Sequence, residues 1–265
     1  MPAKIPFNKS YTSPHELVQI LKSRGLLIID EVKAEHYLMH IGYYRLSAYM
    51  YPLLQIPKER HNFKSGSSFK QVMTLYRFDK KLRLLLFNEI EKIEIAVRSA
   101  IVNIGSKMFG DPFWMTCNQN FINQAKFNKT MSLIDVEMKH SREDFIIHFE
   151  QTYSNPYPPA WILSEILPIG VITNIYSNIR DKKVKKAIAQ AFGIQVPPFE
   201  SWMTIITLPL RTYVNICIIR YFLNVISPGN DMLGKLKSLF AQFPDVDLSA
   251  IGFPVGWEKE SLWNK

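Results

Sequence analysis

The segment between Ser68 and Gly105 most constrains what this chain can fold into, because it contains no Gly or Pro. Ser68 and Gln71 form a capping-box pattern that is typical of a helix start. Apolar residues then recur in steps of three, four or seven, at Val72, Leu75, Leu82, Leu86, Ile90, Ile93, Val97 and Ile101. This spacing predicts one helix of about forty residues, unusually long for a globular domain. A coiled coil is the alternative, but Phe78, Phe87 and the interior charges interrupt a clean heptad pattern.

The rest of the chain also has helical patterns, and we predict an all-α fold. Eleven Gly and few stretches of alternating polarity argue against an all-β fold, and 47% hydrophobic residues suffice for a core. Shorter helices are expected over residues 13–25, 30–42, 123–151, 161–179 (with a break near Pro168), 181–192, from 200, 212–225 and 232–240. The polar loop before residue 68 separates a predicted N-terminal helical extension, residues 1–66, from a predicted compact helical domain, residues 67–265.

Charge and cysteine content indicate the class of partner and the compartment. The net charge of +9 and the pI of about 9.4 favour a partner with a phosphate backbone or an anionic membrane surface, with solubility alone as the alternative. Cys117 and Cys217 lack CxxC spacing and indicate reduced thiols, and the N-terminus does not resemble a signal peptide. No apolar run reaches the roughly 18 residues of a spanning helix, so we expect a cytoplasmic protein without membrane contact.

The sequence lacks the motifs that hold common cofactors and metals. It has no Gly-rich phosphate loop, no Gly-x-Ser-x-Gly turn and no zinc-type cysteine set, so we expect no cofactor. His36 and His40 have the i, i+4 spacing of a helical metal site, but no third ligand completes it. We therefore expect no bound metal.

Two clusters of aromatic and basic residues are the leading candidates for an RNA contact. The first consists of Tyr43, Tyr44 and Arg45, and the second, on the long helix, of Arg77, Lys80, Lys81 and Arg83. Tyrosine rings stack on unpaired bases, and arginines stack or bind phosphate. We predict one RNA-holding groove if the intervening loop folds the two clusters together. A solvated helix face is the alternative for the basic run.

Charged residues further along the chain are secondary candidates. Arg98 lies one turn after Glu94 on a helix face that also carries apolar residues. The two form either a structural ion pair or, with Arg98 near a phosphate, part of the RNA contact. A last basic group consists of Lys182, Lys183, Lys185 and Lys186, and it is either another RNA contact or a solvated helix surface.

Seven sequence blocks form an ordered pattern over nearly the whole chain. They are residues 21–26, 37–49, 75–83, 90–98, 187–193, 201–202 and 252–257. Together they resemble the AbiD/AbiF-type abortive-infection proteins of bacteria, a family that is similar to the HEPN superfamily of helical RNA-cleaving and RNA-binding domains. The resemblance implies a HEPN-like fold, phage defence, a toxin-like ribonuclease, control by a small structured noncoding RNA, and pairing into a homodimer. No DNA specificity is evident.

One departure from the family pattern concerns catalysis. Family members carry an Arg-Asn-x-Cys-Ala-His-His segment soon after a Ser-Trp pair, and in HEPN ribonucleases that Arg and His assist metal-free attack of the 2′-hydroxyl on its own phosphate. Here no such segment follows Ser201 and Trp202, and no histidine occurs after His148. The segment is missing near Leu208, whether deleted, naturally lost, or absent only from the printed sequence.

No catalytic residue is therefore assigned, and enzymatic activity stays open. For the chain as printed we predict RNA binding without cleavage. An active metal-independent endoribonuclease and a non-catalytic helical scaffold for protein interaction are the alternatives.

Overall fold

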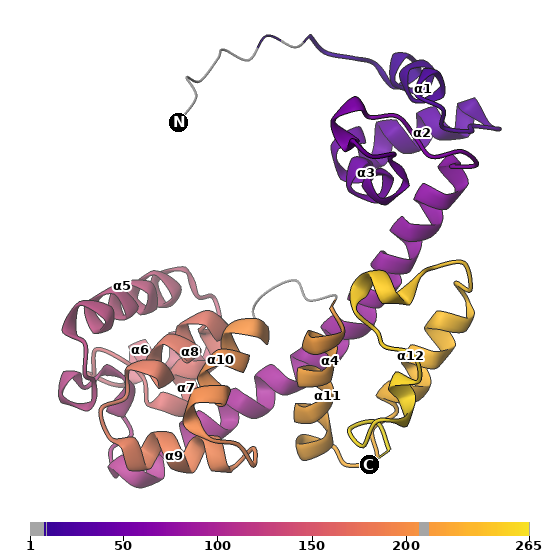
Figure 1. The fold of residues 1–265 in the computed structure, drawn as a ribbon. Coiled ribbons are helices and arrows are strands. Elements are labelled where there is room, and N and C mark those ends of the chain that lie inside the picture. The colour runs from indigo at the N-terminus through magenta and orange to yellow at the C-terminus, as the bar shows by residue number, and fades with distance from the viewer. Residues whose placement is uncertain (1–7, 9, 207–211, 265) are drawn as a thin grey trace. The chain divides into compact units, whose positions relative to one another are not determined.

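The computed structural model of the protein describes residues 8, 10–206 and 212–264, and its secondary structure is helical (Figure 1). The α-helices are α1 (Pro14–Ser23), α2 (Glu31–Ile41), α3 (Tyr43–Met50), α4 (Phe69–Phe109), α5 (Gln124–His140), α6 (Asp144–Thr152), α7 (Ala160–Ile166), α8 (Ile169–Asn178), α9 (Lys182–Gln190), α10 (Val196–Ile206), α11 (Tyr213–Ile226) and α12 (Met232–Ala241). Short 3₁₀-helices cover Tyr51–Leu53, Lys58–Arg60, Trp114–Thr116, Asn118–Asn120, Leu248–Ile251 and Trp257–Lys259. The all-α prediction and the single long helix, α4, are confirmed. Among the described residues, no helix is both long and apolar enough to cross a bilayer.

The chain forms two compact units, and both α4 and α12 contribute residues to each. Unit 1 consists of Met1–Lys81 with Leu239–Val246, and unit 2 of Leu82–Ser238 with Asp247–Lys265. The predicted boundary after residue 66 lies in the loop before α4, whereas this division lies inside α4. The first turns of α4 group with unit 1 because Phe69, Val72 and Met73 are part of its core.

Helices α1 and α2 of unit 1 begin where their capping residues predict. The Ser13 hydroxyl accepts a hydrogen bond from the Glu16 amide at 3.3 Å, and the Glu16 carboxylate accepts one from the Ser13 amide at 2.7 Å. Asp30 caps α2 by accepting from the Lys33 amide at 2.9 Å. Gly25 follows α1 with a φ of +92°, which L side chains rarely adopt, so the helix ends there as predicted.

The core of unit 1 joins the first three helices to the start of α4. Val18, Leu46 and Val72 are fully buried and represent α1, α3 and α4 in this core. The Tyr49 hydroxyl also donates to the buried Asp79 carboxylate at 2.6 Å, which fastens α3 to α4. The orientation of α3 on this core is thus set by both apolar packing and a hydrogen bond to a charged group.

A proline and a serine mark two of the helix boundaries in unit 2. The predicted break near Pro168 is confirmed, since α7 ends at Ile166 and α8 starts at Ile169. The single helix expected over residues 123–151 is wrong, because the chain leaves the helical conformation at Ser141 and α6 begins only at Asp144. The Ser141 hydroxyl accepts from the Glu143 amide at 3.3 Å, a local bond that competes with helix continuation.

A buried carboxylate links α4 to α12 within unit 2. Glu89 is only 1% exposed and accepts hydrogen bonds from Lys92 at 2.7 Å, Lys235 at 2.7 Å and the Asn88 amide at 3.2 Å. Burial by itself would raise the pKa of Glu89 and is the largest single influence. The three donors together outweigh it, so the pKa of Glu89 is lowered and the ionised form is favoured.

Candidate nucleic-acid interface

A hollow of about 420 Å³ in unit 1 gathers aromatic and basic side chains. It lies between the end of α1, the helix α3 and the loop over residues 51–63. Its lining includes Arg24, Tyr43, Tyr44, Tyr51, His61 and Phe63. We call it the tyrosine hollow.

The backbone at Gly42 places two of the tyrosines. Gly42 separates α2 from α3 with φ +90° and ψ 139°, close to a region that is essentially restricted to glycine. Because α3 starts immediately afterwards, Tyr43 packs partly against the core while Tyr44 is 93% exposed. The Ser47 hydroxyl donates to the Tyr44 carbonyl at 2.8 Å within the first turn.

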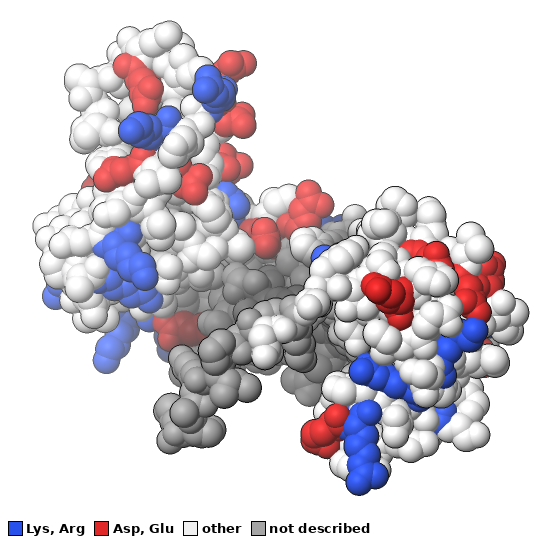
Figure 2. Space-filling view, turned by 90° about the horizontal axis from the view of Figure 1, so that it is seen from above, with Lys and Arg blue, Asp and Glu red and all other residues white. Residues whose placement is uncertain are grey.

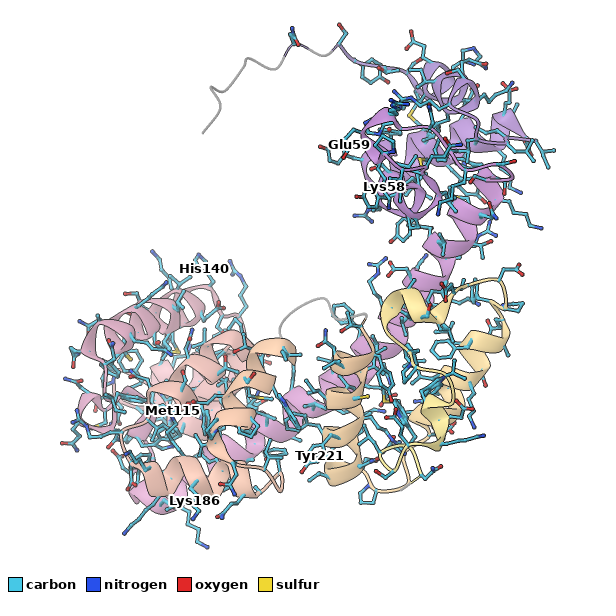
Figure 3. All side chains as sticks on the ribbon, viewed as in Figure 1. Lys58, Glu59, Met115, His140, Lys186 and Tyr221 are labelled. Carbon is cyan, nitrogen blue, oxygen red and sulfur yellow. The ribbon has the colours of Figure 1, made fainter. Side chains whose placement is uncertain are left out.

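The loop over residues 51–63 forms the opposite wall of the tyrosine hollow. The Phe63 amide donates to the Arg24 carbonyl at 2.9 Å, which fixes the returning strand-like segment against the end of α1. The Lys58 ammonium lies 3.7 Å from the centre of the Tyr51 ring and donates to the Tyr51 carbonyl at 3.3 Å. Figure 3 shows Lys58 and Glu59 beside each other on this loop. The wall therefore already contains a cation resting on an aromatic ring.

The polar groups of the tyrosine hollow are left available to a ligand. Within residues 8, 10–206 and 212–264, no hydrogen bond or ion pair engages the Arg24 guanidinium or the hydroxyls of Tyr43, Tyr44 and Tyr51. Arg24 is half-buried, and no carboxylate in the described part of the chain lies within ion-pair distance of it. An anion that enters the hollow could pair with this guanidinium.

The net charge is concentrated in the unit that contains this hollow. Unit 1 has thirteen Lys and Arg against seven Asp and Glu, a net charge of +6, whereas the longer unit 2 has nineteen against sixteen, a net charge of +3. In the view of Figure 2, Lys and Arg form small patches separated by uncharged and acidic side chains. Attraction of a polyanion is therefore local, and it is strongest per residue in unit 1.

This arrangement suits an unpaired nucleotide. Exposed tyrosine rings offer faces for base stacking, and a half-buried arginine offers two parallel donors for a phosphate. Direct reading of a base sequence would require fixed donors and acceptors at base edges, whereas stacking tolerates any base.

The second predicted cluster is not part of the tyrosine hollow. Arg77 instead donates to the Tyr37 hydroxyl at 2.9 Å and lines a different hollow of unit 1. Lys81 donates to Gln242 at 2.6 Å, and its ammonium lies 5.4 Å from the centre of the Phe243 ring. Lys80 is exposed on α4, and Arg83 belongs to unit 2. Arg45 is exposed on α3 next to Tyr44 and does not line the hollow.

The secondary candidates lie in unit 2. Arg98 donates to the carbonyl of Ser164 in α7. Within the described chain, Glu94 makes no ion pair with Arg98 closer than 4 Å, and burial raises the pKa of Glu94 despite the opposing Arg98 charge. Lys185 points inward, with its ammonium 2.5 Å from Glu200 and 3.1 Å from the Ser177 carbonyl.

The other lysines of that basic group face outward. Lys182, Lys183 and Lys186 are exposed on α9, and Figure 3 shows Lys186 extending away from the helix. Helix α9 thus has an outward basic face with one lysine used internally. The missing Arg/His segment expected near Leu208 lies outside the described residues. In the part of the chain that is described, no group of three His, Cys, Asp or Glu side chains is placed to hold a metal.

Sequence reasoning missed four of the lining residues named above, namely Arg24, Tyr51, His61 and Phe63. Arg24 precedes the glycine that ends α1, and Tyr51 and His61 flank a short loop with two basic residues, Lys58 and Arg60. The basic loop next to Tyr51 could have marked this region as a candidate site. The contact that brings the loop against the end of α1 could not be predicted from the sequence.

Comparisons with known proteins give one match. Residues 36–214 match the family model described as Abi-like protein. No curated protein and no solved structure matches the chain. The matched region begins within α2 and includes Tyr43, Tyr44, Tyr51 and His61, but not Arg24.

Proposed function

The chain belongs to the Abi-like protein family, and from that premise we propose that it is an abortive-infection protein that binds RNA through the tyrosine hollow. Family membership indicates the role in phage defence. The RNA partner is our proposal, and so is the HEPN type to which the sequence blocks are similar. We propose that the RNA is a small structured noncoding RNA, which presents unpaired nucleotides in loops and bulges.

One observation carries the RNA assignment. Three tyrosines and an arginine without an acidic partner converge on one hollow of the more basic unit. Exposed tyrosines at a surface are common, but their convergence with Arg24 and His61 gives stacking faces and phosphate donors within reach of one nucleotide.

Binding of a fluorescein-labelled single-stranded RNA to the purified chain tests this proposal. We expect Tyr44→Ala to weaken binding by about 1–3 kcal/mol, the value of one base stack, or roughly 5- to 150-fold. Tyr11→Ala is the matched control, since Tyr11 is 84% exposed in the same unit but lies outside the hollow. Equal losses for both variants would contradict a specific role of the hollow.

Salt dependence tests the phosphate contact separately. Arg24→Glu should weaken binding and reduce the slope of log affinity against log salt by about 0.7, the value for one phosphate contact on a single strand. Lys139→Glu, at an exposed position on α5, is the matched charge control and should leave both quantities nearly unchanged. An unchanged slope in Arg24→Glu would exclude Arg24 as a phosphate ligand.

The same labelled RNA separates binding from cleavage. We propose binding without cleavage, because the sequence offers no Arg/His pair after Trp202 for metal-free chemistry. Incubation with EDTA should leave the RNA intact. Fragments ending in a 2′,3′-cyclic phosphate would instead support the metal-independent endoribonuclease.

A further inference from the structure

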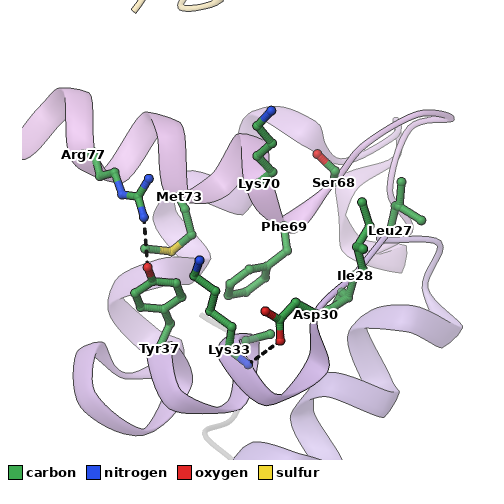
Figure 4. Close-up of a pocket in the computed structure, with 12 residues that line it drawn as sticks. Leu27, Ile28, Asp30, Lys33, Tyr37, Ser68, Phe69, Lys70, Met73 and Arg77 are labelled. Carbon is green, nitrogen blue, oxygen red and sulfur yellow. Dashed lines mark hydrogen bonds between the residues drawn. The ribbon is translucent and has the colours of Figure 1, made fainter.

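A second hollow of unit 1, of about 410 Å³, lies between residues 27–37 and residues 68–77 (Figure 4). We call it the aliphatic hollow. Ala34, Phe69 and Met73 line it, and each is at most 7% exposed because it also belongs to the core of the unit. The hollow is thus an indentation that reaches the apolar core.

Large aliphatic side chains stand exposed at its edge. Leu27 is 57% exposed and Ile29 86%, and both line the hollow. Val32, in the first turn of α2, is 80% exposed but does not line the hollow. A single exposed aliphatic residue needs no explanation, but two that line the same hollow indicate an interaction surface.

Basic side chains complete the lining. In the described part of the chain, no carboxylate lies within ion-pair distance of Lys33 or Lys70. Arg77 donates to the neutral Tyr37 hydroxyl, and Asp30 is engaged as the cap of α2. Figure 4 shows the ends of Lys33 and Arg77 on the same side of the hollow, near Tyr37. The lining therefore has three basic side chains against one carboxylate, an excess of positive charge.

We propose that the aliphatic hollow docks a segment of another protein that inserts a Leu, Ile or Phe side chain and pairs flanking Asp or Glu residues with Lys33, Lys70 and Arg77. Charge complementarity selects an acidic segment, and the apolar floor selects a hydrophobic anchor. A short amphipathic helix meets both requirements, with anchors on one face and carboxylates beside them.

The side-chain types favour a protein segment over RNA at this position. Base stacking requires accessible ring faces, and the aromatic rings here, Phe69 and Tyr37, are buried or half-buried against the core. Aliphatic groups such as those of Leu27 and Ile29 pack against apolar side chains but offer no hydrogen-bonding group to the polar edge of a base. The two hollows of unit 1 thus have different chemistry and would serve different partners.

A synthetic peptide tests the docking proposal. The probe is a fluorescein-labelled helical peptide with Leu at positions i, i+3, i+4 and i+7 and Glu or Asp elsewhere. We expect it to bind wild type, and to bind at least tenfold more weakly to Lys33→Glu and to Ile29→Ser. Both positions lie at the surface, so far-ultraviolet circular dichroism should be unchanged in each variant. Lys80→Glu is the matched control, because Lys80 is exposed on α4 outside the hollow and should leave affinity unchanged.

Peptide and RNA controls separate the alternatives. A scrambled peptide of the same composition and a peptide with Lys in place of its acidic residues should both fail to bind. Single-stranded RNA should bind Lys33→Glu and Ile29→Ser nearly as well as wild type, since the tyrosine hollow is intact in both. The proposal is wrong if the acidic peptide binds no better than the scrambled one, or if both variants retain wild-type affinity for it. Loss of RNA binding in both variants would assign this hollow to RNA instead.

Discussion

Gly105 lies at a position of α4 that has no room for a side chain. A Cβ built there would lie 2.5 Å from Cζ2 of Trp114, whose ring is fully buried, stacks on Phe109 at 5.1 Å and donates to the Ser106 hydroxyl at 3.2 Å. Such a ring cannot give way as the end of a flexible side chain would. The glycine is therefore retained inside a helix because of packing, despite its low helix propensity.

Gly105→Ala should accordingly destabilise the protein. Overpacking costs about 1–3 kcal/mol, and the gain in helix propensity of about 1 kcal/mol offsets only part of it. We expect a net decrease in the free energy of unfolding, measured by urea denaturation. Gly170→Ala is the matched control, because no atom lies within 4 Å of the added Cβ in α8, and it should be neutral or stabilising. Stabilisation by both substitutions would contradict the packing argument.

At single positions, the sequence identified exposed residues better than it identified neighbours. Tyr44 was selected as a candidate RNA contact from its aromatic-basic context, and in the structure it is exposed and lines the tyrosine hollow. Arg24 and His61 line the same hollow but are 37 positions apart in the chain. Their proximity depends on the hydrogen bond from Phe63 to the Arg24 carbonyl, which no local pattern encodes.

Among the elements, helix α4 was the easiest to predict from the sequence. Its buried charged residues were the hardest to predict. The apolar repeat and the absence of Gly and Pro are local properties, so they predicted one long helix that runs from Phe69 to Phe109. Which carboxylate of the helix is buried depends on a partner elsewhere. Glu89, not singled out by its spacing, is buried because Lys235 reaches it from α12.

This contact predicts a stability loss in Glu89→Gln. The substitution removes the charge that two lysines hydrogen-bond, and hydrogen bonds to charged groups each contribute about 1.5–3 kcal/mol. The lysines remain partly solvated, so we expect a decrease near the lower value, about 1.5 kcal/mol, in the free energy of unfolding at pH 7. Glu91→Gln, at an exposed position on the same helix, should change stability by less than about 0.5 kcal/mol.

The same contact predicts a pH dependence. Because the folded-state pKa of Glu89 is below its ordinary value of 4.5, the stabilisation is complete above that value and is lost as the pH falls through the folded pKa. The difference in unfolding free energy between wild type and Glu89→Gln should therefore shrink from pH 7 to pH 3. A constant difference over this range would show that the carboxylate charge is not the stabilising feature.

On the scale of the whole molecule, the two units share helices, and their unfolding should be coupled. All five tryptophans belong to unit 2, so their fluorescence reports on that unit, whereas far-ultraviolet circular dichroism reports on every helix. Loss of the unit 1 core would leave the first turns of α4 and the last of α12 without packing, and unsupported helix ends are marginal in water. We expect both signals to change at the same urea concentration. A dichroism change that precedes the fluorescence change would show that the units unfold independently.

Helix α4 continues without interruption across the position, between Lys81 and Leu82, where one unit gives way to the other. Proteases require several residues of extended backbone in their clefts, and a regular helix does not provide them. Brief digestion should therefore trim the ends and loops of the polypeptide without cutting at this position. In the cell, unit 1, which contains both hollows, and unit 2 would therefore be cleared at one rate.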